Sequence, residues 1–221
     1  GWMIGVEGRW AEHHVRLFHD LYRKPWLQFD SYRPSTFVSS GLQYDGRFGS
    51  VRFVLRLDEK VANRELVSGV LPAAPFEHRH RLRIRLEAEG NRRVRPSFDV
   101  VFVHLRDSEV ETGEGIGQRL VWLASRRFTV TSGVVFFKSD SGNSGIYLYE
   151  PDLPGYFAVP LLSDSGERAY VLVAARISPN LTCWIKGTLA RYEEERTIGS
   201  GVDRLTARQL RSVAFAIRFG L

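Results

Sequence analysis

The chain has 221 residues, of which 43% are hydrophobic and 12% aromatic, so it can bury a core and is not a disordered chain. Its formal net charge of +6 is small for this length, and charge alone therefore identifies no acidic partner. The single cysteine, Cys183, excludes an intrachain disulfide and a zinc site built from cysteines. The length suits one large all-β domain, and we expect residues 1–221 to form a single unit.

The first expected element is a helix over residues 9–23. Its apolar positions fall near one helical face, and Pro25 follows as a stop signal. These positions are Trp10, Val15, Leu17, Phe18 and Leu21. The pattern predicts an N-terminal helical arm over 9–23, ahead of a β core over 48–221.

After Pro25 the sequence alternates between apolar and polar residues, which is the period of a half-buried strand. Residues 51–58 alternate in this way, and 98–105 is a nearly continuous apolar run. Further strands are expected at 82–86, 120–124, 128–130, 134–137, 146–149, 156–162, 170–177 and 183–192. The predicted fold class is mainly β: an antiparallel sandwich or squat β-barrel of the jelly-roll kind, with one N-terminal helix.

Turn residues divide these runs. The segment SDSGNSG at 139–145 predicts a hairpin between the flanking strands, and the longer stretches 59–76 and 106–118 are expected as surface loops. Near the end of the sequence, 206–217 has helical spacing, whereas Val213, Phe215, Ile217 and Phe219 alternate as in a strand. We favour a short turn followed by a strand.

The stretch EHRHRLRIRLEAEGNRRVRP at 77–96 is the main candidate for a binding surface. If it begins with a strand, Leu82, Ile84 and Leu86 face the core while the arginines between them form an outward row. The candidate anion- or partner-binding residues are Arg79, Arg81, Arg83, Arg85, Arg92, Arg93 and Arg95.

Three interpretations of this arginine row stay open. It is a solvated face or protected edge strand, a surface for an anion such as nucleic acid, sulfated glycan or phospholipid, or a subunit interface that meets Glu193–Glu195 of a neighbour. Nucleic-acid binding through the Arg79–Arg95 surface is the alternative function that follows from the second interpretation.

Catalytic and metal-binding patterns are weak. His78 and His80 would project from one side of a strand and could share a metal with a third ligand such as His104, but the next acid, Glu87, lies on the opposite face. GEGIG at 113–117 lacks the lysine of a phosphate-binding loop. We therefore expect a non-enzymatic protein with no catalytic residue, metal or cofactor, and a hydrolase or metalloenzyme with a dispersed site is the second alternative.

The runs FTVTSGVVFFKSDSGNSGIYLYEPDLPGYFAVPLL and YVLVAARISPNLTCWIKGTLARY, with their short strands and Gly/Ser/Asp turns, resemble a viral capsid or capsid-spike β domain. The resemblance implies a homo-oligomer, a dimer or larger, that binds a cell-surface receptor or anionic glycan at the virion surface. A protein without a viral origin would be soluble and cytoplasmic. Because no apolar run approaches about 18 residues, no membrane insertion is expected.

Overall fold

The computed structural model describes residues 1–23, 36–63, 76–88, 93–107, 109–157, 159–198 and 205–220. Its strands are β1 (Trp2–Trp10), β2 (His13–Arg23), β3 (Thr36–Phe48), β4 (Val51–Asn63), β5 (Phe76–Ala88), β6 (Val94–Arg106), β7 (Val110–Leu123), β8 (Phe128–Ser139), β9 (Ile146–Tyr147), β10 (Leu161–Leu162), β11 (Ser165–Ser178), β12 (Leu181–Ile198) and β13 (Leu205–Phe219). None of the described residues is helical.

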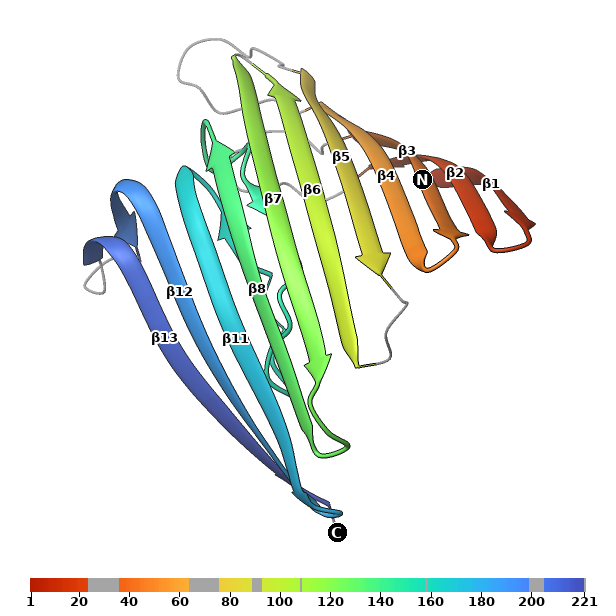
Figure 1. The fold of residues 1–221 in the computed structure, drawn as a ribbon. Helices are drawn as coiled ribbons and strands as arrows, with labels where there is room; N and C mark the ends of the chain where they lie inside the picture. Colours follow the sequence, from red (N-terminus) through yellow and green to blue (C-terminus); the bar gives the residue numbers. More distant parts are fainter. Residues whose placement is uncertain are drawn as a thin grey trace.

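The described strands form one 11-stranded antiparallel sheet in the order β1 to β8, β11, β12, β13, and β9 pairs with β10 in a separate two-stranded sheet. Figure 1 shows this meander as a single curled layer with β1 and β13 at its two edges. The predicted sandwich or jelly roll is wrong, because those folds need crossovers between two packed sheets, whereas here each large strand pairs with its neighbour in sequence.

The predicted N-terminal helix over 9–23 is also wrong. Those residues form the end of β1, a tight turn at Ala11 and Glu12, and β2. Ala11 adopts a positive φ of 48°, so the turn carries none of the usual glycine or asparagine signals. Val15, Leu17 and Leu21 share one face of β2, and the four-residue spacing of Leu17 and Leu21 also fits a helical pattern.

The two ends of the sheet differ in their connections. At one end the strands are joined over short stretches, such as residues 11–12, 49–50, 124–127 and 179–180. At the other end most connections are longer: 24–35, 64–75, 140–164 and 199–204. The predicted loop at 106–118 is mostly β7, and the predicted loop at 59–76 begins with the last residues of β4, its residues 64–75 lying outside the described ranges.

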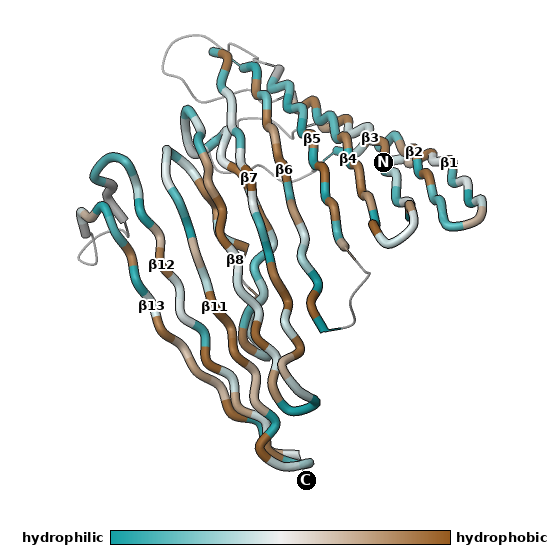
Figure 2. The backbone as a smooth tube through the Cα atoms, in the orientation of Figure 1, coloured by the Kyte–Doolittle hydropathy of each residue, from teal (hydrophilic) through white to brown (hydrophobic). Residues whose placement is uncertain are grey.

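The sheet has a polar face and an apolar face, which the alternation of side chains along each strand separates. On β6, Ser97, Asp99 and Val101 are buried on the polar face, whereas Phe98 and Phe102 are exposed on the apolar face. Figure 2 shows the same alternation along the strands. The predicted alternation within 77–88 is therefore correct, but its sense is reversed: Arg79 to Arg85 lie half-buried on the polar face, and Leu86 is exposed on the other.

Residues 140–164, called here the inner segment, cover part of the polar face. Ile146, Leu148 and Leu162 of this segment pack with Val101, Val103 and Phe137 of β6 and β8. Figure 1 shows the segment on one side of β7 and β8. The hairpin predicted at SDSGNSG is wrong, because β9 pairs with β10 while β8 pairs with β7 and β11.

Glycines in β7 make room for the inner segment. A Cβ atom added at Gly113 would lie 2.0 Å from the Ser144 carbonyl oxygen, and one at Gly115 would lie 2.0 Å from Ile146 Cδ1. Gly117 continues the row, with Leu148 at 3.5 Å. The GEGIG sequence, which has the glycine content of a phosphate-binding loop, is therefore a strand whose glycines admit the inner segment.

The glycine row leads to a first prediction. Gly113→Ala should displace the inner segment and lower the free energy of unfolding by about 1–3 kcal/mol, because the clash is with a backbone oxygen. Gly187→Ala on β12 is the matched control, since nothing lies within 4 Å of its added Cβ. Denaturant unfolding and protease cleavage within 140–164 measure both effects. Equal stability of the two variants would contradict the packing described.

Candidate functional site

The apolar face is the largest surface feature of the described chain. Its aromatic and aliphatic side chains are exposed on strands from one edge of the sheet to the other, including Ile4 (62%), Phe102 (44%), Phe136 (56%) and Phe215 (77%). On a single strand every second residue belongs to this face. These alternate residues are apolar over 94–102, 128–136 and 181–189, with Ser132 and Gly187 as the small residues among them. Each run is about nine residues, the length with which a tilted strand crosses the hydrocarbon core of a bilayer.

Aromatic side chains border this face at the end with short connections. Five exposed residues lie in or near the terminal positions of their strands there: Trp10, Phe48, Trp122, Phe128 and Phe219. Register places all five on the apolar face. Rings of aromatic residues of this kind flank the lipid-facing band of membrane-spanning barrels.

The predicted arginine row lies on the polar face, where acids partner most of it. Asp99 of β6 accepts bonds from Arg83 at 3.0 Å and from Arg85 at 2.9 Å. Arg79 lies 3.2 Å from Glu77. The row is therefore an ordered charge network rather than a solvated outer surface.

Arg81 is the exception in this row. It is half-buried, and no hydrogen bond or ion pair joins it to any residue that the structure describes. The acid directly opposite, Asp58, is bonded to Arg56 at 2.8 Å. Arg56 in turn stands opposite Arg83, so β4 and β5 bring guanidinium groups together as their alternation suggested.

The other predicted residues of the basic stretch are dispersed. Arg95 is exposed on the polar face near the start of β6, and Arg93 precedes β6 with its carbonyl oxygen accepting a bond from the Leu123 N–H at 2.7 Å. Arg92 lies outside the described residues. The structure thus brings Arg79, Arg81, Arg83 and Arg85 together, and among the described residues Arg93 and Arg95 lie outside that row on β5.

Buried ion pairs hold the inner segment against the sheet. Glu150 of the segment accepts bonds from Arg168 of β11 at 2.6 Å and from Lys186 of β12 at 2.7 Å. Asp152 lies 3.3 Å from the same lysine. Glu150 and Lys186 side chains are only 5% and 7% exposed. No pattern in the sequence indicates these pairs, because the partners are distant in sequence.

A further polar contact ties the start of the inner segment to β7. The Asp140 carboxylate accepts bonds from the Thr112 N–H at 2.6 Å and from the Thr112 hydroxyl at 2.9 Å. These donors, the backbone N–H first, hold the pKa of Asp140 below its ordinary value of 3.8. The Asp140 carboxylate therefore stays ionised, and keeps accepting both bonds, to a lower pH than a free aspartate would.

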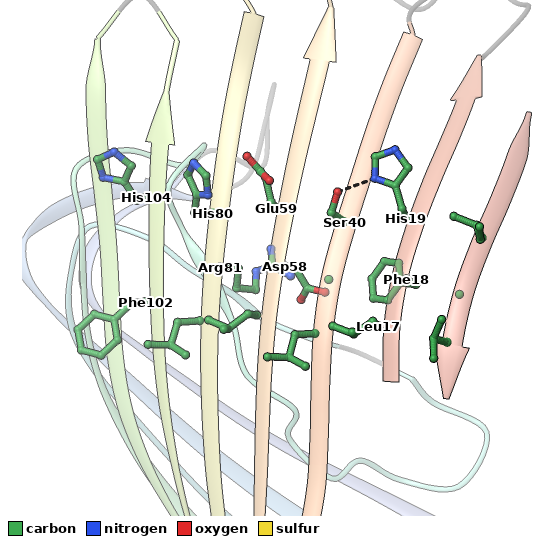
Figure 3. A pocket seen from close by; sticks show the side chains of 17 residues that line it. Leu17, Phe18, His19, Ser40, Asp58, Glu59, His80, Arg81, Phe102 and His104 are labelled. Carbon is green, nitrogen blue, oxygen red and sulfur yellow. Dashed lines mark hydrogen bonds between the residues drawn. The ribbon is translucent and has the colours of Figure 1, made fainter. Parts of the chain in front are cut away.

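A row of polar side chains crosses the apolar face toward the end with long connections. Register aligns His19, Ser40, Glu59, His80 and His104 on neighbouring strands, and Figure 3 shows them side by side. His19 Nδ1 lies 2.9 Å from Ser40 Oγ. Next to this row is an apolar groove of about 740 Å³, whose lining includes Leu57, Leu82 and Phe102.

His78, His80 and His104 were considered as metal ligands in the second alternative function. Within the described ranges no group of three or more His, Cys, Asp or Glu side chains could hold one ion. His80 and His104 face each other across β5 and β6, with ring centroids 6.2 Å apart. In the same ranges there is no helix long and apolar enough to cross a membrane.

Comparison with known proteins identifies a fold but no family. No protein-family model matches the chain, and no curated protein matches its sequence. The curled antiparallel sheet resembles the fold of a bacterial outer-membrane β-barrel protein. A solved structure of OmpT (in-vitro folded), an outer membrane protein of Vibrio cholerae, is similar with a TM-score of 0.58 over 99% of this chain, at 8% identity. The chain covers 64% of the length of that protein.

This similarity corrects the functional predictions. The predicted capsid or spike function is wrong, since the similar protein is an outer membrane protein and nothing viral was found. The expectation of no membrane insertion is contradicted by the same comparison, which likewise supports no receptor, glycan, nucleic acid or homo-oligomeric partner.

The buried ion pairs give a second prediction. Glu150→Gln should lower the free energy of unfolding by about 3–5 kcal/mol, because it leaves Arg168 and Lys186 on the polar face without their main acid. Glu167→Gln is the control, since its pair with Arg191 is exposed and contributes about 0–1 kcal/mol. Denaturant titration of the two variants measures the difference, and a Glu150 variant as stable as the Glu167 variant would refute the anchoring role.

Proposed function

We propose that this chain forms part of the wall of a membrane-spanning β-barrel in a bacterial outer membrane. The observation that carries the proposal is the apolar face, where exposed side chains extend across the whole sheet in runs of about nine residues. The fold similarity to an outer membrane protein supports the same conclusion. The apolar face is then in contact with lipid, and the polar face lines the interior.

The burial of side chains favours a lipid environment. Water-soluble monomers rarely expose a continuous apolar patch larger than a few hundred Å². Here the exposed set includes Trp2, Phe98, Ile116, Val213 and Phe219, each between 46% and 75% exposed. In a bilayer these side chains meet acyl chains rather than water, so the same exposure carries no penalty.

The sheet edges add a condition to this proposal. β1 and β13 do not pair with each other in the described part of the chain, and both run toward the end with short connections. Backbone groups cannot stay unpaired in hydrocarbon. An all-antiparallel barrel therefore needs an odd number of further strands between β13 and β1.

The third prediction tests which face meets lipid. Phe215→Arg on β13 should destabilise the protein in phosphatidylcholine vesicles by up to about 2–4 kcal/mol, because arginine is then placed among acyl chains. Ser212→Arg on the polar face of the same strand should cost much less. Both positions are exposed, so the two substitutions would be equally mild in a water-soluble protein.

The measurement is guanidinium unfolding of protein refolded into vesicles, with Phe215→Leu as the control for loss of the aromatic ring. Equal destabilisation by the two arginines would show that β13 does not present Phe215 to lipid. Failure of the unmodified chain to associate with vesicles would refute the proposed function itself.

The polar face favours anions in the interior. Beside the ion pairs of β4 to β6, Arg81 keeps a half-buried positive charge that no hydrogen bond or ion pair of a described residue holds, although the Asp58 carboxylate opposite attracts it. A charge of this kind raises the local concentration of anions in an interior with low-dielectric walls. The proposal therefore includes a preference for anions along the Arg79–Arg85 row.

The fourth prediction concerns that preference. Arg81→Gln should lower the ratio of anion to cation permeability, measured as the reversal potential across a planar bilayer with a KCl gradient. Arg211→Gln is the matched control, because Arg211 extends from the apolar face of β13. A reversal potential that shifts equally in both variants would contradict a specific role for Arg81.

A further inference from the structure

The inner segment has one side packed on the sheet and another side that faces the interior. Ile146 and Leu148 are 0% and 5% exposed and belong to the buried cluster, whereas Tyr147 and Tyr149 are 45% and 48% exposed. Leu161 of β10 is opposite Tyr147 in register and is exposed as well. Because alternate residues of an extended segment point to opposite sides, these two tyrosines and Leu161 form an apolar surface directed away from the sheet, called here the aromatic platform.

Arg81 of β5 lies beside this platform. In register it is directly opposite Val103 of β6, and Val103 belongs to the buried cluster that includes Ile146. Tyr147 is the next residue of the inner segment and is close enough to Arg81 to interact with it electrostatically. The border between the inner segment and β5 therefore brings a tyrosine and a guanidinium together on the interior side of the sheet.

The guanidinium of Arg81 is open to an added group. The other three arginines of its row are partnered by Asp99 or Glu77. Arg81 has no hydrogen bond or ion pair with any residue that the structure describes, and the Asp58 carboxylate opposite is bonded to Arg56. The row thus offers one unpaired guanidinium, and this guanidinium is the one next to the aromatic platform.

We propose that the interior binds aromatic carboxylates at this border, with the carboxylate on Arg81 and the ring against Tyr147. The proposal rests on the proposed function, in which the polar face lines the interior, and it names the class of anion that the Arg79–Arg85 row prefers. A guanidinium fork holds both oxygens of a carboxylate, and a tyrosine ring stacks on a flat apolar ring. Leu161 extends the apolar contact beyond Tyr147.

Two features separate this class from other anions. Chloride or acetate can reach Arg81 but leaves the aromatic platform unused, so its binding gains electrostatic attraction alone. A second negative charge on the ligand finds no other unpaired guanidinium in the row and approaches the Asp58 carboxylate. A single carboxylate attached to a flat ring therefore uses all of the groups that this border offers.

Ligand-observed NMR titration of the full chain in non-ionic detergent tests the proposal with benzoate, cyclohexanecarboxylate and benzamide. Benzoate carries both the charge and the flat ring, cyclohexanecarboxylate only the charge, and benzamide only the ring. Benzoate should bind about three- to tenfold more tightly than cyclohexanecarboxylate, the worth of one stacked aromatic contact. It should bind about tenfold more tightly than benzamide, which cannot form the charge-assisted pair.

Variants assign each preference to its residue. Arg81→Gln should weaken both carboxylates by about tenfold and leave benzamide unchanged. Tyr147→Leu should weaken benzoate and benzamide by about three- to tenfold and leave cyclohexanecarboxylate unchanged. Tyr156→Leu is the matched control, because Tyr156 is an exposed tyrosine of the same segment in the turn that its N–H closes on Leu153, and it should change none of the three affinities.

Equal binding of benzoate and cyclohexanecarboxylate would reduce the border to a simple anion site, and equal binding of benzoate and benzamide would leave Arg81 without a role. Either result overturns the proposal, as does an effect of Tyr156→Leu as large as that of Tyr147→Leu. A chain that inserts into vesicles but shows none of these preferences refutes this inference alone, whereas a chain that does not associate with vesicles refutes the proposed function.

Discussion

A single layer of paired strands imposes one constraint on every residue of this protein. Backbone hydrogen bonds are satisfied within the sheet, so each side chain has only two possible surroundings, one on each face. The pairing keeps this choice in register from β1 through β8 to β11, β12 and β13. A shift of one residue on any strand would move arginines to the apolar face and leucines to the polar one.

The polar face carries a buried apolar cluster where the inner segment covers it. Val101, Val103 and Phe137 are buried there because Ile146 and its neighbours pack against them. The approach is close enough that β7 carries glycine at successive positions of that face, beginning at Gly113. Glu150 then connects the segment to β11 and β12 through buried charges, so packing and electrostatics act on the same segment from two sides.

The apolar face has the opposite organisation, since most of its large side chains are exposed in the described chain. Aromatic residues such as Trp122 border it at one end, and the polar row through His80 and His104 borders it at the other on β5 and β6. These two borders match the two interfaces of a bilayer. A hollow of about 400 Å³ beside Arg106 belongs to the second border.

The sequence alone determined the strand period and, through it, which residues share a face. Arg79 to Arg85 were placed together on one side of β5 and Leu82 to Leu86 on the other, since alternation depends only on local geometry.

Only the tertiary structure decided which side is exposed. A core-facing and a lipid-facing leucine have the same pattern, so the fold was taken as a sandwich. The tertiary structure also decided that 9–23 is a hairpin, because the spacing of Leu17 and Leu21 fits both periods and only pairing with β1 and β3 distinguishes them. The pairs of Glu150 and the hollow beside Arg106 required residues distant in sequence to meet, which no local pattern records.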